Sequence, residues 1–567
     1  MKKIFSVMTL LILSLALASC GVKRIGETEE TDAAKTQLFV GNFDGGYGEE
    51  WIKKAKTRFE EKYKDVSFEE GKKGVQVLIK SSKNYVGVNL QTEIAGLKQD
   101  IFFTESVYYY DFVNQGLLLD ISDVVEKPLN YEFIDGAVNT SNETSSIEDK
   151  MHVGHTNFLK TPEAKYYGLP FYEANYNLIY DVDLFNDELL YFAAPGMGNS
   201  FGFITNEDMA RSAGPDGDIT TTFDNGLPAT YDEFFRLADY MVRKNIVPIT
   251  WAGNVQNYVS SLLTSFWADF EGMEQMMLNY NFDGTASHIV DGFDSNGKPI
   301  VKSQVITEDN GYLTYGKQLG RYHALSFLEQ LLSNKTYYNS SLVFSPAQTH
   351  RDAQDSFLSG KYISNNDTVG ILIDGTWWQH ESGNVFDAMV KAYGEDASAK
   401  NRKFGVMPIP KVDEDHLGKS TVYEANFSMA FINGNVEKWK QPLAKAFLQF
   451  VHTNESLVEF TKTTNTFRPF EYDMSEADVA SLTHWGRSLY DIHTKSEFVT
   501  PYDYNAVYLK NISTYANELD IWSAMVNKNA LYNIPTTAMF NDSVTARKYF
   551  EGLTNFWSKE YWDSRKD

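Results

Sequence analysis

Apolar and polar positions alternate along the first part of the chain in blocks that predict strands and helices in turn. Short apolar runs at residues 37–40, 75–80 and 100–104 have the length of buried strands. Residues 51–63 and 90–98, which lie between these runs, show the spacing of amphipathic helices. Strands that alternate with helices in this way predict parallel crossover connections, and therefore an α/β lobe.

A second set of strands and helices is predicted after Pro170. Thr230 is followed three residues later by Glu233, a pattern typical of the start of a helix. The other predicted elements are a β-rich run at 166–185, strands at 247–251, 369–374, 404–411 and 425–432, a hairpin insertion at about 279–302 and one long helix at 441–460. These elements predict a second α/β lobe, and 567 residues suffice for two lobes with separate cores.

The first residues have the features of a secretion signal. Lys2 and Lys3 precede an apolar stretch, residues 8–18, that is too short to span a membrane as a stable helix. The stretch ends in Leu-Ala-Ser-Cys, which resembles a bacterial lipobox in which Cys20 becomes the lipidation site and carries acyl chains such as palmitate. An ordinary cleaved signal with a chance cysteine is the alternative.

Cys20 is also the only cysteine, so we expect neither a disulfide framework nor a catalytic thiol. The polar residues 21–35 have too few apolar side chains to form a core and predict a flexible tether. No later segment offers about eighteen uninterrupted apolar residues. We therefore expect a protein that is lipid-anchored on the extracytoplasmic face of the bacterial cell membrane.

Charge and aromatic content narrow the class of ligand. The formal net charge is −25, and removal of the signal takes away two lysines and no acid, which gives −27. Such a field repels phosphate backbones and anionic lipid, so we expect no nucleic-acid partner. Aromatic residues make up 14% of the chain, including 34 Tyr and 10 Trp. Tyr and Trp offer a flat apolar face with a polar edge, which suits neutral polyols.

Three motifs that suggest catalysis or metal binding lack the residues that the chemistry needs. Ser200 in "GNSFG" is not preceded by a strand, as an esterase nucleophile would be. The stretch 311–318 resembles a phosphate loop but ends in Gln318 instead of Ser or Thr. His152 and His155 lack the glutamate of hydrolytic zinc sites. We expect no catalytic residue, no metal and no cofactor, although 76 acidic residues leave paired carboxylates for glycoside cleavage open.

The main signal for a ligand site is a repeated pattern in which a predicted strand ends in aromatic and acidic residues. The run 369–374 closes at Asp374 and is followed by Trp377 and Trp378. Similar clusters follow other predicted strands, at Asp44 and Tyr47, at Glu105 and Tyr108, at Tyr172 and Glu173, and at Trp251. Ligands of open α/β sheets bind beyond the carboxyl ends of the strands. We therefore expect one carbohydrate cleft, with inward packing of the tryptophans as the alternative.

In this cleft, rings would stack on the apolar faces of the sugar. Glu105, Glu173, Asp44 and Asn426 would accept hydrogen bonds from sugar hydroxyls, and charged acceptors strengthen such bonds.

Five segments carry a resemblance to a known family. They are residues 100–125, 167–185, 357–378, 404–411 and 444–460. Together with the lipobox, they resemble the family 1 extracellular solute-binding proteins of carbohydrate ABC transporters, to which maltose-binding protein is a more distant relative. The resemblance implies a type II periplasmic-binding-protein-like fold, in which two lobes, each a mostly parallel sheet flanked by helices, close on a sugar about a hinge. It also implies delivery of the ligand to the permease subunits.

By position, the tryptophans of "GTWW" resemble the stacking residue of the family, and the loops at Glu105 and at Tyr172–Glu173 resemble its sugar contacts. We therefore predict a monomeric binding protein without catalysis that captures an oligosaccharide. The predicted division is a signal peptide at 1–19, a tether at 20–35, lobe 1 at 36–160 and about 420–470, and lobe 2 at 161–419 and about 471–567. Two alternatives remain open: a lipid-anchored glycoside hydrolase or lyase with an aromatic cleft, and a peptide-binding transport protein on the same fold.

Overall fold

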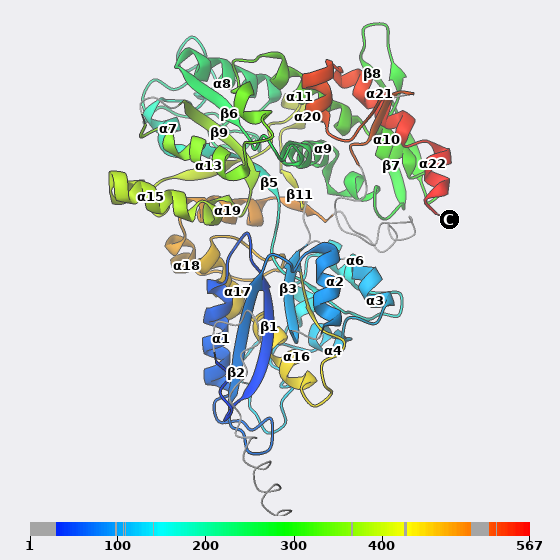
Figure 1. Cartoon of the computed structure of the whole chain (residues 1–567). Coiled ribbons are helices and arrows are strands. Elements are labelled where there is room, and N and C mark those ends of the chain that lie inside the picture. Colours follow the sequence, from blue (N-terminus) through cyan, green and yellow to red (C-terminus); the bar gives the residue numbers. More distant parts are fainter. Residues whose placement is uncertain are drawn as a thin grey trace, which may run out of the picture.

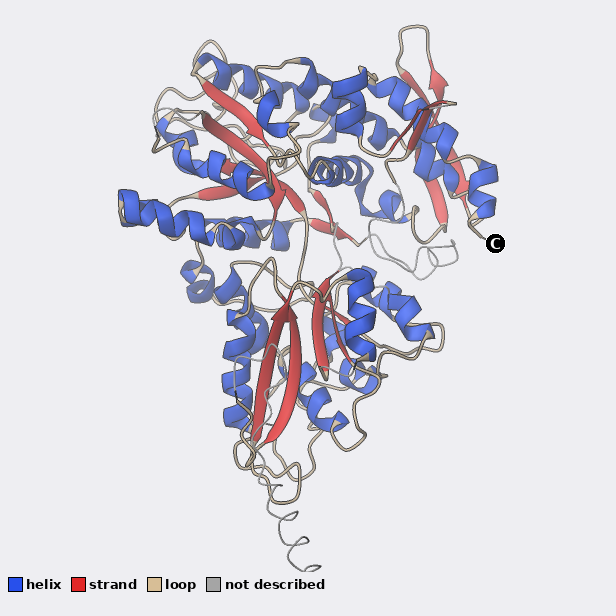
Figure 2. Ribbon diagram, viewed as in Figure 1, coloured by secondary structure: helices blue, strands red, loops and turns tan. Residues whose placement is uncertain are grey.

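The computed structural model shows two lobes, one above the other in Figures 1 and 2. It describes residues 30–96, 99–105, 107, 109–139, 141–363, 367–424, 428–500, 521–528 and 530–566. The predicted signal peptide, Cys20, Tyr108 and Asn426 lie outside these residues. Among the residues that are described, no helix has both the length and the hydropathy that crossing a bilayer requires.

Lobe 1 is built on a five-stranded sheet in the order β2-β1-β3-β12-β4. Its strands are β1 (Thr36–Phe43), β2 (Val75–Ser82), β3 (Ile101–Glu105), β4 (Leu169–Pro170) and β12 (Ser428–Ile432). The helices of this lobe are α1 (Glu50–Lys62), α2 (Gly87–Ala95), α3 (Tyr109–Asn114), α4 (Ser122–Glu126), α5 (Ile147–Lys150), α6 (Val153–Leu159), α16 (Gln441–Phe450) and α17 (Asn454–Thr464). Helix α1 buries Trp51, Ala55 and Phe59 against the sheet, as its apolar spacing predicts.

Lobe 2 contains a four-stranded sheet in the order β10-β5-β9-β6. Its strands are β5 (Tyr176–Asp181), β6 (Ile246–Thr250), β9 (Thr368–Gly375) and β10 (Phe404–Met407). The helices around it are α7 (Val182–Asp187), α8 (Tyr231–Arg243), α9 (Asn257–Met277), α11 (Leu319–Ser333), α12 (Ser340–Val343), α13 (His350–Ser359), α14 (Trp378–Glu381), α15 (Gly383–Tyr393), α18 (Glu476–Ser481) and α19 (His484–Lys495). The predicted helix start at Thr230 is confirmed, because its side chain caps α8 by accepting from the amide of Glu233.

A long extension enlarges lobe 2 on one flank, at the right in Figure 1. It contains β7 (Gly284–Phe293), β8 (Pro299–Ile306), α10 (Tyr312–Lys317), β14 (Ala524–Asn527), β15 (Ala530–Tyr532), α20 (Pro535–Asp542), α21 (Ala546–Phe556) and α22 (Lys559–Ser564). The predicted hairpin insertion is confirmed as the antiparallel pair β7–β8. Helix α21 packs on α11 and α10, so the C-terminal segment joins the core of lobe 2.

The two-lobed α/β fold expected from the sequence is confirmed, and the strand pairing within each sheet is mixed. Strand β1 is parallel to β2 and β3, and β6 is parallel to β9. Strands β12 and β5 run antiparallel to their neighbours. Both are the first strand after the chain enters their lobe from the other one, so they run away from the gap between the lobes. Strands β1, β3 and β9 run toward that gap.

The described chain passes between the lobes at three places. The first passage joins β4 to β5, and the third joins α17 to α18 and α19. The second lies between β11 (Thr421–Tyr423) and β12, and its residues 425–427 are outside the described ranges. Strand β13 (Glu497–Val499) then pairs with β11. Near the third passage, the predicted single helix at 441–460 is wrong, because Thr453 is extended and caps the start of a separate helix, α17.

Candidate functional site

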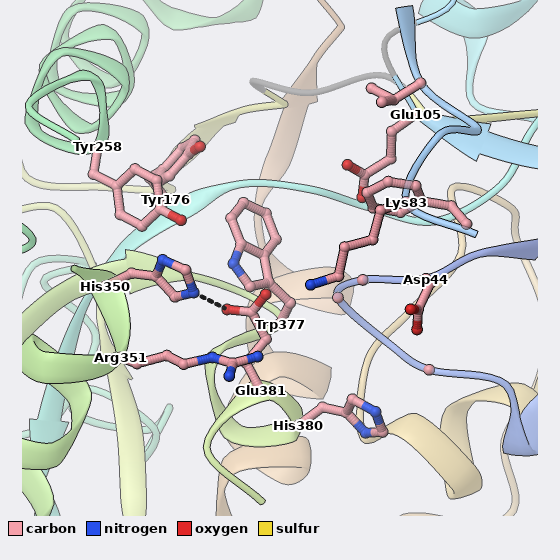
Figure 3. A pocket seen from close by; sticks show the side chains of 15 residues that line it. Asp44, Lys83, Glu105, Tyr176, Tyr258, His350, Arg351, Trp377, His380 and Glu381 are labelled. Atoms are coloured by element: carbon pink, nitrogen blue, oxygen red, sulfur yellow. Dashed lines mark ion pairs between the residues drawn. The ribbon is translucent and has the colours of Figure 1, made fainter. Parts of the chain in front are cut away.

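A cleft of about 780 Å³ lies between the two lobes. Lobe 1 contributes Phe43, Asp44, Gly45, Gly46, Gly48, Lys83, Val86 and Glu105, and lobe 2 contributes Tyr176, Tyr258, His350, Arg351, Trp377, His380 and Glu381 (Figure 3). The lobe 1 side chains lie at or just beyond the carboxyl ends of β1, β2 and β3, and the Trp377 turn follows the end of β9. This is the position in which ligands of α/β sheets bind.

Aromatic rings form the lobe 2 wall of the cleft. The ring centroid of Trp377 lies 5.3 Å from that of Tyr176 in an edge-to-face arrangement, and Tyr176 lies 4.8 Å from Tyr258. Figure 3 shows the indole of Trp377 in the middle of the cleft. Trp377 is 8% exposed, and the part of its surface that is not packed lines the cleft. Such a surface offers an apolar face for the ring of a sugar.

The turn that carries Trp377 depends on a glycine and on a buried carboxyl group. A Cβ atom on Gly375 would lie 2.3 Å from the Trp377 ring, so the indole can fold back over the strand end only if this position is glycine. Asp374 is 1% exposed. It accepts hydrogen bonds from Gln354 Nε2 (2.9 Å) and from the amide of Gly375 (2.7 Å), and Gln354 Oε1 accepts one from Ser382 (3.0 Å). Asp374 therefore supports the aromatic wall from beneath.

The protonation of Asp374 leads to a testable pH dependence. Burial raises its pKa from 3.8 to about 8, although its two hydrogen bonds oppose this shift. Between these values the folded protein holds a proton that the unfolded chain has released. This group therefore stabilises the fold at low pH, and its contribution is lost as the pH rises through about 8. We expect Asp374→Asn to reduce the fall in unfolding free energy between about pH 5 and about pH 8, measured by denaturant titration. An unchanged pH dependence would contradict the assignment.

Charged groups from both lobes also face the cleft. Burial, aided by the charge of Glu381, raises the pKa of Glu105 to about 8. Burial likewise raises the pKa of Glu381, whose Oε2 lies 3.8 Å from His350 Nε2. Lys83 and Arg351 are exposed. Within the described ranges, no group of three or more His, Cys, Asp or Glu side chains is placed to hold a metal ion.

The glycine-rich loop after β1 touches lobe 2 directly. The Tyr47 hydroxyl lies 2.7 Å from Thr376 Oγ1 and donates to the carbonyl of Glu173 at 3.2 Å. A Cβ atom on Gly48, which has a φ of +65°, would lie 2.6 Å from His380 Nε2. Tyr47 is buried and packs edge-to-face on Tyr172 at 4.6 Å. Tyr47 and Tyr172 therefore join the lobes beside the first passage instead of lining the cleft.

The structure brings together three of the residues that the sequence suggested. Asp44, Glu105 and Trp377 line the same cleft. Asp374 lies beneath it, and Tyr47, Tyr172 and Glu173 lie at the junction of the lobes. Glu173 Oε1 is 2.7 Å from His493 Nδ1, so its carboxylate already has a partner.

Two other tryptophans that the sequence suggested lie in the core of lobe 2. Trp251 is 1% exposed and donates to Gln256 Oε1 at 3.2 Å, and the ring of Trp378 is fully buried. Our proposal of a stacking role is therefore limited to Trp377.

Several cleft residues were missed by the sequence analysis. Lys83 and Val86 follow β2, so the rule that selected the ends of other strands applies to them as well. Tyr258 and Arg351 lie in the first turns of helices α9 and α13, and no local pattern marks them. Glu381 lies four residues after Trp377, close enough along the chain to share its turn.

Comparisons with known proteins define the fold. No family model matches the sequence, and no curated protein matches it. The structure is similar to that of a chitin oligosaccharide binding protein, with a TM-score of 0.54 and 14% identity over 94% of this chain and 99% of the other. For a protein from work on xylan utilization by Caldanaerobius polysaccharolyticus, the TM-score is 0.51 and the identity is 12%, over 92% of this chain and 99% of the other. For apo RafE from Streptococcus pneumoniae, the TM-score is 0.51 and the identity is 13%, over 95% of this chain and 100% of the other. The expected resemblance to two-lobed solute-binding proteins is thus confirmed in the fold.

Proposed function

We propose that this protein is a lipid-anchored, extracytoplasmic member of the family 1 solute-binding proteins. It captures a carbohydrate, an oligosaccharide, in the cleft between its lobes and delivers it to the permease subunits of an ABC transporter. It acts as a monomer and catalyses no reaction.

The observation that carries this proposal is the convergence of an aromatic wall and polar side chains from opposite lobes on one cleft. Trp377, Tyr176 and Tyr258 come from lobe 2, whereas Asp44 and Glu105 come from lobe 1. Apolar ring faces with a few well-placed polar groups are typical of small-molecule sites. The fold it shares with a chitin oligosaccharide binding protein supports the same class of ligand.

The two-lobe arrangement also supports a capture mechanism. A ligand shifts an equilibrium between open and closed lobes only through contacts that differ between the two states. A sugar that stacks on Trp377 and bonds to Glu105 would make contacts with both lobes, and these contacts favour closure about the passages between the lobes. The predicted lipobox at Cys20 and the tether would hold the two lobes at the extracytoplasmic face of the cell membrane, within reach of the permease.

Replacement of Trp377 by alanine is expected to weaken oligosaccharide binding by about 1–3 kcal/mol, because the ring supplies the apolar surface on which the sugar stacks. The ligand would first be identified on a glycan array, and the affinities of both proteins would then be measured by calorimetry. Trp439→Ala is a matched control, since Trp439 is 47% exposed and does not line the cleft.

Equal affinities of the Trp377→Ala variant and the parent would refute the stacking role. Incubation of the protein with the oligosaccharide distinguishes binding from cleavage. Recovery of the intact oligosaccharide supports transport, whereas new reducing ends would indicate a glycoside hydrolase that uses carboxyl groups on the two sides of the cleft.

A further inference from the structure

The cleft contains two positively charged side chains, one from each lobe. Lys83 follows β2 in lobe 1, and Arg351 lies in the first turn of α13 in lobe 2. Both are exposed and both line the cleft. Figure 3 shows them extending toward Trp377 from opposite sides.

The positive charge of these two side chains contrasts with the acidic net charge of the chain. The protein has 76 acidic residues against 51 Lys and Arg. Elsewhere in lobe 2, Arg402 is paired with Asp181 at 2.5 Å and Lys411 with Asp269 at 2.7 Å. Lys83 and Arg351 are instead exposed in the cleft between the lobes, where Arg351 acts on Glu381 through its charge without a close ion pair. A ligand that carries negative charge would give both cations a close partner.

The carboxyl groups of the cleft offset these charges only in part. Glu105 has a pKa of about 8 because of its burial and the charge of Glu381, so at neutral pH it is mostly protonated. Burial also raises the pKa of Glu381, and the charges of His350, whose Nε2 lies 3.8 Å away, and of Arg351 oppose that rise. Asp44 lies on the exposed rim. The centre of the cleft is therefore less negative than the count of its acidic residues suggests.

We propose that the ligand is an acidic oligosaccharide whose sugar carboxylates pair with Lys83 and Arg351, one from each lobe, while Trp377 stacks on a ring. This inference rests on the proposed function and names the class of its ligand. The planar guanidinium of Arg351 matches a carboxylate through two parallel hydrogen bonds, whereas Lys83 acts as a point charge. Because the two cations belong to different lobes, an anionic ligand between them draws the lobes together.

The test compares uronate oligosaccharides with their own methyl esters, which keep the sugar skeleton and lose the charge. The probes are oligogalacturonates, oligomannuronates and glucuronate-substituted xylo-oligosaccharides, titrated by calorimetry into the full-length protein at low and high salt. We expect at least one uronate to bind about tenfold or more tightly than its ester. Added salt should weaken binding of the uronate more than that of the ester.

Variants assign the effect to the two side chains. Lys83→Met and Arg351→Met should each weaken uronate binding about tenfold and leave binding of the ester unchanged. Lys438→Met removes an exposed positive charge outside the cleft and should change neither. Uronate binding that is insensitive to both cleft variants would overturn the inference.

Binding of neutral oligosaccharides without binding of any uronate would overturn the inference and leave the proposed function intact. Failure of both the acidic and the neutral oligosaccharides to bind would refute the proposed function as well.

Discussion

Replacement of Trp378 by alanine is expected to lower the free energy of unfolding by about 3–5 kcal/mol, because it would leave a cavity in the core of lobe 2. The indole is fully buried. Its centroid lies 5.0 Å from that of Phe404, 5.6 Å from that of Trp485 and 5.8 Å from that of Phe357. Removal of the ring deprives all three neighbours of a packing partner.

Denaturant unfolding of the variant and the parent measures this loss. Trp439→Ala is again the control, because an exposed tryptophan should change the unfolding free energy by less than about 0.5 kcal/mol. Trp378→Phe should retain part of the lost stability, since it fills some of the cavity. A loss below about 1 kcal/mol for Trp378→Ala would show that the ring is not packed as the structure describes.

Replacement of Arg468 by leucine is expected to lower the free energy of unfolding by about 3 kcal/mol or more. The guanidinium is fully buried near the third passage between the lobes. It donates to the carbonyl of Phe171 (2.6 Å), to that of Val451 (2.7 Å) and to His452 Nε2 (2.8 Å). Leucine would leave these three acceptors unpaired, and each buried unpaired group costs about 1–3 kcal/mol.

The hydrogen bonds of Arg468 connect the first and third passages, so this residue should also affect the lobe junction. Burial lowers the pKa of Arg468 to about 9, so it remains charged at neutral pH. Burial and the charge of Arg468 lower the pKa of His452, whose neutral ring can accept at Nε2 while Nδ1 donates to the Leu448 carbonyl.

Arg468→Lys keeps the charge but cannot reproduce the fork of donors, and it should recover only part of the stability. Unfolding curves of Arg468→Leu and Arg468→Lys that coincide with that of the parent would contradict this role.

Many elements of the fold were predictable because their signals are local. The apolar runs of β1, β2, β3 and β9, and the amphipathic spacing of α1, are properties of a few neighbouring residues. The break between α16 and α17 was missed because the apolar spacing continues through Thr453, while its side chain caps the second helix. The antiparallel direction of β5 and β12 depends on which lobe the chain has just left, and no local pattern records this.

The cleft was predictable only in part, for a related reason. Asp44, Glu105 and Trp377 were identified because each lies where a predicted strand ends, and the end of an apolar run can be located in the sequence. Adjacent residues in a turn can point in opposite directions, so the sequence does not tell which of Trp377 and Trp378 faces the cleft. In the structure, α13, α15 and α19 enclose Trp378 in the core, and Trp377 lines the cleft.

The sequence by itself determined the alternation of strands and helices, the apolar faces that bury the cores, the acidic net charge and the strand ends at which a ligand site can form. Only the tertiary structure decided which of those ends meet, because Lys83 and Arg351 are 268 positions apart and share one cleft only after two lobes have folded and been joined by three passages. Local patterns arise from neighbours along the chain, whereas a binding site arises from neighbours in space, and that relation exists only once the chain has folded.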